Sequence, residues 1–175
     1  MPEIAEVETV RNTLKLKILN KKITKVNILY SKMIETNLED FKTNLIDKEF
    51  IDIKRVGKYL LFELDNYYLI SHLRMEGKYF IKNSLEEIVK HEHVIITFID
   101  NTDLRYHDTR KFGRMALIKK EELDNYAGIK KQGLEPFNEK LNANYLKEKL
   151  KNKTLPIKTI LLDQTIISGL GNIYA

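Results

Sequence analysis

The chain contains no cysteine, and its apolar residues form no long uninterrupted run. Without cysteine the chain forms no disulfide and offers no thiolate to a metal ion, which excludes cysteine-ligated sites within these residues. The N-terminal residues lack the apolar core of a signal peptide, and no apolar stretch reaches the length that spans a bilayer. These absences predict a cytoplasmic protein with no membrane association.

The composition leaves room for a packed core. Hydrophobic residues make up 43% of the 175 residues, which argues against wholesale disorder. Lysine and arginine number 30 against 25 aspartates and glutamates, so the net charge is +5. This moderate positive charge permits a nucleic-acid partner, although many basic proteins bind none.

Hydrophobic periodicity predicts an α+β fold. Residues 3–19 carry apolar side chains at three- and four-residue steps, as in an amphipathic helix, and residues 22–30 alternate as a strand. A short helix is expected within residues 38–45. Further strands are predicted at 59–64, 67–73, 78–81, 94–99, 104–107 and 115–118, with hairpin turns at Asp65-Asn66 and Asp100-Asn101. Many short strands with turn signals favour a sandwich or a flattened barrel.

The pattern changes after Gly133, so we predict one domain at residues 1–133 and a second at residues 134–175. Helices are predicted at 144–151 and 156–163, followed by a tight turn at 168–172 and another helix beginning at Asn172. That last helix would contain one turn, which is marginal by itself. We therefore expect the chain to be part of a longer protein.

The first residues place a candidate nucleophile beside two carboxylates. Removal of Met1 would free the secondary amine of Pro2. The ordinary pKa of an α-amino group is about 8, so an appreciable fraction of such amines is neutral and nucleophilic at cellular pH. Such amines form Schiff bases with electrophilic carbons. Glu3 and Glu6 follow at i, i+3 spacing, close to one helix face. An ordinary helix start explains the same residues, because proline and glutamate both suit the first turn.

Candidate binding residues stand at the ends of the predicted strands. Lys58 either contacts a phosphate or a sugar, or is a solvated strand end. His72 is either a ligand contact or a structural histidine, and Met75 is either an exposed apolar tip or core filling. His91 and His93 share one face, as in some metal sites, but no third ligand is evident and we favour a polar or phosphate-contacting role.

Two loops carry the densest signals. The segment 110–114 surrounds Phe112 with three cations, which suits phosphate binding with an apolar wedge for a base stack; the alternative is a charged hairpin whose Phe112 packs in the core. The segment Gly169-Leu170-Gly171-Asn172 opens the last predicted helix, where backbone N–H groups bind phosphate oxygens. An ordinary connection between helices explains this segment equally well.

Taken together, these motifs resemble the formamidopyrimidine-DNA glycosylase family, the bifunctional base-excision enzymes for oxidised purines. Five segments occur in the family's order: 2–11, 57–61, 72–77, 110–113, and 162–164 followed by 169–175. The resemblance implies an N-terminal helix on a two-layer β-sandwich, followed by an incomplete helix–two-turn–helix domain. It also implies a monomer that acts on double-stranded DNA containing oxidised bases or abasic sites.

The resemblance implies four catalytic residues. Pro2 would attack C1′ of the damaged nucleotide, and Glu3 would open the sugar as a general acid/base. Glu6 would shape the surroundings of the nucleophile. Lys58 would contact a nearby phosphate and transfer a proton during β-elimination.

The resemblance also implies two sets of DNA contacts. The gap left by a flipped nucleotide would be filled by Met75, Arg110 and Phe112, with Arg110 facing the orphaned cytosine. Phosphates would be contacted by His72, His91, Lys153 and Asn172.

The chain departs from the family pattern in three respects. Ala5 replaces a common second proline, and Met1, if retained, would convert the Pro2 amine to an amide. The family's structural zinc, held by a C-terminal four-cysteine finger, has no ligands here, so we expect no metal or cofactor in this chain. The finger and the lesion-capping loop lie outside residues 1–175, so we expect weak DNA binding and impaired activity.

Two alternatives remain open. An endonuclease VIII-type glycosylase for oxidised pyrimidines shares the Pro-Glu start, although the segments 7–11 and 110–113 fit the purine branch better. A non-catalytic remnant that binds damaged DNA is the other alternative. Its binding would be sensitive to salt and insensitive to substitution of Pro2 or Glu3.

Overall fold

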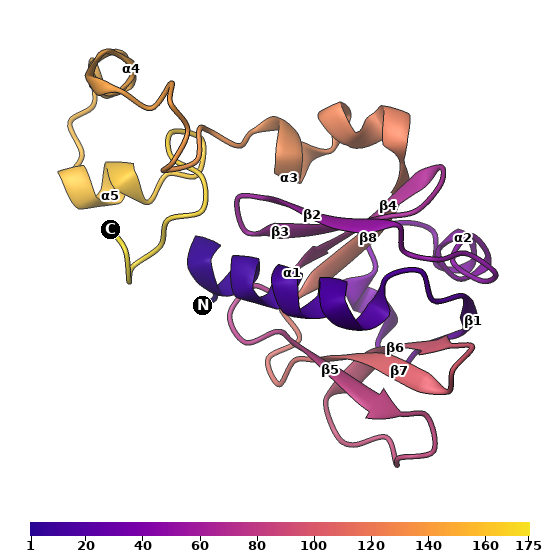
Figure 1. Cartoon of the computed structure of the whole chain (residues 1–175). Coiled ribbons are helices and arrows are strands. Elements are labelled where there is room, and N and C mark those ends of the chain that lie inside the picture. Colours follow the sequence, from indigo (N-terminus) through magenta and orange to yellow (C-terminus); the bar gives the residue numbers. More distant parts are fainter.

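The computed structural model describes residues 1–175 as two packed antiparallel sheets, a long N-terminal helix and a peripheral group of short helices (Figure 1). The helix α1 (Ile4–Ile18) lies along one open side of the two sheets. The first sheet has the strand order β1-β6-β7-β5, and the second has the order β2-β3-β4-β8. This architecture confirms the α+β fold with an N-terminal helix on a two-layer sandwich.

The strands are short, and most lie close to their predicted positions. The first sheet contains β1 (Ile23–Ile28), β6 (Glu92–Phe98), β7 (Thr102–His107) and β5 (Lys78–Asn83). The second sheet contains β2 (Asp52–Val56), β3 (Tyr59–Glu63), β4 (Tyr67–His72) and β8 (Arg114–Lys119). Both predicted hairpins form, and Asn101 adopts the left-handed φ of 60° that its turn requires.

The main core lies between the two sheets and α1. Val7, Leu14 and Ile18 are buried because they share the face of α1 that packs on this core. Phe50 lies 5.2 Å from Phe62, measured between ring centroids, and the surrounding side chains are almost fully buried. This core holds the start of α1, and with it the first residues of the chain, against the sandwich.

Short helices cover the outside of the second sheet. The 3₁₀ helix η2 (Lys120–Asn125) and the helix α3 (Ala127–Lys130) pack over a second cluster of buried apolar residues. The strand β4 is therefore buried on both faces, and its sequence is apolar without strict alternation. The 3₁₀ helix η1 (Ser31–Met33) and the helix α2 (Leu38–Thr43) each bury one apolar side chain, Met33 and Phe41, in the main core.

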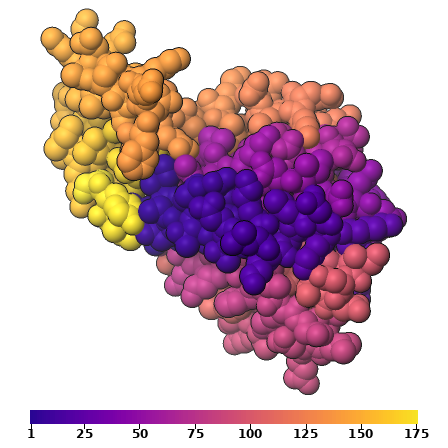
Figure 2. Space-filling model, in the orientation of Figure 1, coloured from indigo at the N-terminus to yellow at the C-terminus, as the bar shows by residue number.

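The residues after Gly133 form a small helical unit with its own apolar cluster. It contains α4 (Ala143–Leu150) and α5 (Ile157–Leu161), and its buried residues are Ile160, Ile166 and Ile167. Figure 2 shows this unit seated against the first turns of α1. The exact division of the chain at residue 133 stays a prediction.

Four elements of the structure were not predicted, namely β2, η1, η2 and α3. Residues 172–174 form a turn in place of the predicted helix, and the N–H of Ala175 donates to the carbonyl of Gly171 at 3.0 Å. No helix of the structure has both the length and the apolar content needed to cross a membrane.

Candidate active site

A cavity of about 470 Å³ opens where the N-terminus, the second sheet and the C-terminal unit meet. Its walls include Met1, Lys58, His72, Arg74, Lys131 and Asn172. Four of these side chains are basic or imidazole groups. The cavity therefore combines the start of the chain with a lining suited to a negatively charged ligand.

Glu3 is buried beside this cavity by contacts with the far end of the chain. Its side chain is 2% exposed, and its carboxylate accepts hydrogen bonds from the backbone N–H groups of Ile173 (2.8 Å) and Tyr174 (3.3 Å). A Cβ on Gly171 would lie only 2.4 Å from Glu3 Oε1, so the lack of a side chain at residue 171 permits this approach. The turn after Gly171 thus fixes the orientation of the carboxylate.

Glu6 braces the same residues from the first turn of α1. Its Oε2 accepts a hydrogen bond from the backbone N–H of Glu3 at 3.0 Å, and its Oε1 accepts one from the Tyr174 hydroxyl at 2.8 Å. The bond from Tyr174 lowers the pKa of the Glu6 carboxyl. Glu6 is therefore ionised at neutral pH and held in one orientation.

The Pro2 nitrogen lies next to the cavity. Met1 is bonded to this nitrogen and itself lines the cavity. Removal of Met1 would therefore leave a free secondary amine at residue 2, next to the cavity that Met1 lines. The geometry is that expected for an N-terminal nucleophile next to a buried carboxylate.

Lys58 lies in the turn immediately before β3 and is almost fully buried, with only 4% of its surface exposed. Burial lowers the pKa of its ammonium group, and the negative charge of Glu3 partly opposes this shift. A lowered pKa increases the neutral fraction of the amine, which is the form that accepts a proton. The alternative of a solvated strand end is wrong.

His72 lines the cavity as a neutral imidazole. Burial, followed by the charges of Arg74 and Lys58, lowers its pKa to about 3. Its Nδ1 accepts a hydrogen bond from the backbone N–H of Arg74 at 3.0 Å, so the proton of the neutral ring is on Nε2. His72 is therefore an uncharged hydrogen-bond donor, suited to a phosphate or sugar oxygen.

The two predicted wedge loops lie side by side. Met75 is 40% exposed and Phe112 is 46% exposed, so the alternatives that place them in the core are wrong. The guanidinium of Arg110 stacks over the Phe112 ring at 4.7 Å. A hydrogen bond from Thr109 to Glu76 joins the two loops. Exposed apolar tips beside a cation are the chemistry that a base-stack wedge requires.

Asp108, which was not predicted from the sequence, organises the loop that carries Arg110 and Phe112. It is fully buried, and its carboxylate accepts hydrogen bonds from the backbone N–H groups of Arg110 (3.0 Å) and Gly113 (2.8 Å). Aspartate at the start of a turn is a recognised signal for this arrangement. That signal was present in the sequence but carries no functional meaning by itself.

The histidine pair supports the same loop. The His93 Nε2 lies 2.8 Å from the carbonyl oxygen of Asp108, and the N–H of Asp108 donates to the carbonyl of His91 at 3.0 Å. Desolvation, followed by the charge of Lys90, lowers the pKa of the His91 imidazole. No group of three or more His, Asp or Glu side chains is arranged to hold a metal ion. A phosphate contact by His91 stays a prediction.

The remaining two candidates lie in the C-terminal unit. Asn172 is exposed and lines the cavity, close to the turn that holds Glu3. Lys153 is exposed between α4 and α5 and does not line the cavity. The structure therefore brings Glu3, Lys58, His72 and Asn172 to one place and leaves Lys153 on an outer surface.

We expect Gly113→Ala to destabilise the wedge loop. A Cβ on residue 113 would lie 1.8 Å from the hydroxyl oxygen of Tyr106 and 2.7 Å from its ring, in a fully packed environment. Overpacking of this kind costs about 1–3 kcal/mol, measurable as a lower free energy of unfolding in urea. Tyr106→Phe removes the nearest colliding atom and should restore part of the loss. An unchanged stability in Gly113→Ala would contradict this close packing.

The fold and the cavity together define a helix-fronted β-sandwich protein with a helix–two-turn–helix unit. Residues 1–115 match the model described as the formamidopyrimidine-DNA glycosylase N-terminal domain, and residues 132–175 match the model of the H2TH domain of the same enzymes. The chain belongs to the formamidopyrimidine-DNA glycosylase family.

Known relatives agree with this assignment. The chain is 49% identical to the formamidopyrimidine-DNA glycosylase of Ligilactobacillus salivarius, which it matches over 100% of its own length and 64% of that protein. It is 45% identical to the enzyme of Halalkalibacterium halodurans, over 99% of its own length and 64% of that protein. The chain therefore spans just under two thirds of the length of these relatives.

Solved structures show the same fold. A complex of the Lactococcus lactis Fpg with DNA containing an abasic site has a TM-score of 0.93 and 43% identity, over 98% of this chain and 64% of that chain. A complex of the same protein with FAPY-dG-containing DNA also has a TM-score of 0.93 and 43% identity, over 98% of this chain and 65% of that chain.

Proposed function

We propose that the chain carries the catalytic centre of a DNA glycosylase that removes oxidised purines and then cleaves the strand at the resulting abasic site. The proposal rests chiefly on one observation. Glu3, which follows Pro2, is buried against Gly171, and Gly171 lines the same cavity as Met1 and Lys58. A nucleophile, an acid and a proton acceptor with a lowered pKa are thereby gathered around one space.

The proposed chemistry uses these groups in sequence. After removal of Met1, the Pro2 amine adds to C1′ of the damaged nucleotide, and the bond from C1′ to the base breaks as the base leaves with the bonding electrons. The Pro2 N–H proton passes to the Glu3 carboxylate as the amine adds, and Glu3 then donates this proton to the sugar ring oxygen, which opens the ring and leaves an iminium on Pro2. The iminium acidifies the adjacent C2′ proton. Transfer of this proton to Lys58 expels the 3′ phosphate and breaks the strand.

The wedge loops account for access to the base. A base must leave the stack to reach the cavity, and the loss of its stacking costs about a few kcal/mol. Insertion of Met75 and Phe112 would offset this cost, while Arg110 contacts the unpaired partner base. The complexes of the Lactococcus lactis relative with FAPY-dG-containing DNA and with abasic-site DNA support DNA with such lesions as the substrate.

Borohydride trapping on a duplex with an abasic site tests the proposal. An abasic site needs no base recognition, so the experiment measures the amine alone. Mass spectrometry first establishes that Met1 has been removed. We expect a covalent protein–DNA adduct from this species and none from protein that retains N-formyl-Met1, in which the Pro2 nitrogen is an amide.

Absence of an adduct from processed protein, at low salt and high DNA concentration, would overturn the catalytic proposal. Salt-sensitive binding of damaged duplex without an adduct would then support the non-catalytic alternative. Cleavage of thymine-glycol duplex in preference to 8-oxoguanine duplex would instead support the oxidised-pyrimidine alternative.

A further inference from the structure

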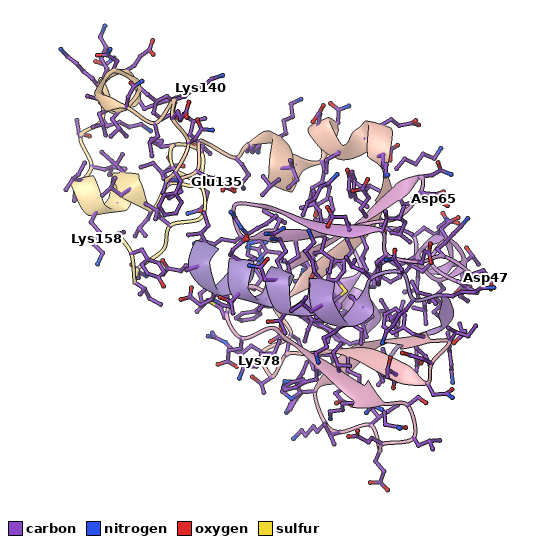
Figure 3. The ribbon with its side chains drawn as sticks, viewed as in Figure 1. Asp47, Asp65, Lys78, Glu135, Lys140 and Lys158 are labelled. Carbon is purple, nitrogen blue, oxygen red and sulfur yellow. The ribbon has the colours of Figure 1, made fainter.

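Arg55, near the end of β2, contacts two segments that are distant from it in the sequence. Its Nε donates to Glu8 Oε2 of α1 at 2.8 Å. Its Nη1 and Nη2 donate to the two carboxylate oxygens of Glu135 at 2.7 and 2.9 Å. The planar guanidinium and the Glu135 carboxylate therefore form a two-bond fork, which fixes direction as well as distance. Figure 3 shows Glu135 where the C-terminal unit meets the rest of the molecule.

The same fork holds the backbone of the turn that precedes Lys58. Arg55 Nη1 also donates to the carbonyl of Gly57 at 2.9 Å, and the N–H of Gly57 donates to Glu135 Oε1 at 2.8 Å. Gly57 has a left-handed φ of 55°, so the turn needs glycine and these bonds keep it closed. The position of Lys58 thus depends directly on the pair formed by Arg55 and Glu135.

Glu135 is in turn connected to the residues that bind Glu3. The neighbouring carbonyl of Leu134 accepts a hydrogen bond from the N–H of Ser168 at 2.9 Å. Residue 168 begins the loop that leads to Gly171 and to the amide donors of Glu3. Arg55 and Glu135 therefore connect three parts of the molecule. The first is α1, which begins directly after Glu3. The second is the turn before Lys58, and the third is the C-terminal unit that holds the Glu3 carboxylate.

Arg55 is also poorly placed to contact DNA. Its side chain is only 14% exposed, and four hydrogen bonds to protein acceptors occupy its nitrogens. Arginine has five N–H donors, so only one remains that could bind a phosphate. The contacts of Arg55 therefore indicate a structural role and not DNA binding.

We propose that Arg55 and Glu135 form a clamp that positions Lys58 relative to Glu3 and keeps the unit after Gly133 seated on α1. Arg55 is thus a positioning residue. The expected effect of the clamp on catalysis rests on the proposed glycosylase function. Removal of Arg55 leaves the Glu135 carboxylate partly buried without its charged partner, so the contact should open and not merely weaken.

Opening of the clamp has a distinctive electrostatic consequence. Lys58 faces the carboxylate of Glu3, the neutral ring of His72, and the cations Arg74 and Lys131 across the cavity. If the turn at Gly57 moves outward, Lys58 gains water and its pKa rises toward the ordinary value of a lysine. The pH dependence of strand cleavage would then shift in the alkaline direction, which a uniform loss of stability would not cause.

Arg55→Met tests the clamp, and Arg11→Met is its matched control. Arg11 also binds Glu8, but its other bonds go to Asn12 and to the carbonyl of Ile53, all within α1 and β2. In Arg55→Met we expect backbone hydrogen exchange at Gly57, Ile173 and Tyr174 to accelerate at least tenfold. The rate of adduct formation at an abasic site should fall at least tenfold, and the pH profile of cleavage should move to higher pH. Arg11→Met should change each quantity less than twofold.

The outcomes separate the clamp from the proposed function. Equal exchange in both variants would overturn the clamp, whatever the activity. No adduct from wild-type protein, with faster exchange only in Arg55→Met, would overturn the proposed function and leave the clamp supported. If Arg55→Met does not fold, Glu135→Gln keeps the shape and removes one charge, and the same exchange measurement applies to it.

Discussion

Glu3→Gln is expected to slow the removal of 8-oxoguanine from duplex DNA by about 10²- to 10⁴-fold, the range that a positioned general acid/base contributes. The carboxylate is buried and receives two backbone N–H donors, from Ile173 and Tyr174. A glutamine has one oxygen for these two donors, and its amide nitrogen would face the second. The variant therefore loses both the acid and part of the support for its orientation.

Single-turnover excision assays measure this loss, and trapping at an abasic site identifies its cause. Because the base is already absent there, Glu3→Gln should reduce trapping much less than excision. Glu39→Gln changes an exposed carboxylate on α2 and serves as the control. An excision rate for Glu3→Gln within threefold of wild type would refute the assigned role.

Gly171→Ala is expected to reduce excision at least about 100-fold, the cost of a displacement of roughly 1 Å at a reacting group. A Cβ at this position would lie 2.4 Å from Glu3 Oε1, 2.5 Å from its Cδ and 2.9 Å from its Cγ. Real contacts are never this short, so either the carboxylate or the turn must move. Both movements disturb the hydrogen bonds from Ile173 and Tyr174.

A double-mutant cycle tests the origin of the Gly171→Ala defect. If the new methyl group acts through Glu3, it should destabilise the wild-type protein but have little effect in Glu3→Ala, where the colliding atoms are absent. Thermal unfolding of the four proteins provides the comparison. Equal destabilisation in both backgrounds would mean that the methyl group acts on the backbone turn and not on the carboxylate.

Local sequence patterns predicted the parts of the fold that depend on local interactions. The helix α1 follows from apolar spacing, and the hairpins follow from Asp65-Asn66 and Asp100-Asn101. The strand β2 was missed because Lys54 and Arg55 interrupt its apolar pattern. The structure pairs these cations with carboxylates on neighbouring elements, namely Glu63 and Glu8. Carboxylates that are distant in the sequence neutralise these cations in the folded chain. Hydrophobic periodicity cannot predict such partners.

The candidate site was predicted through family resemblance more than through local physics. The spacing of Glu3 and Glu6 indicated a shared helix face, but the donors to Glu3 lie 170 and 171 residues further along the chain. The clamp at Arg55 and the buried Asp108 also depend on tertiary contacts. No local pattern identifies such partners, and the assigned roles of all eleven predicted site residues stay predictions.

The hydrogen bonds between Glu3 and the turn after Gly171 have a consequence for synthesis of the chain. Proteins emerge from the ribosome N-terminus first, and contacts between distant residues form late. The sandwich can begin to assemble once β8 has emerged, but the Glu3 carboxylate lacks its hydrogen bonds from Ile173 and Tyr174 until these residues have also emerged. The first residues to be translated are therefore among the last to reach their final geometry. This part of the site can therefore reach its final arrangement only after residues 173 and 174 have left the ribosome.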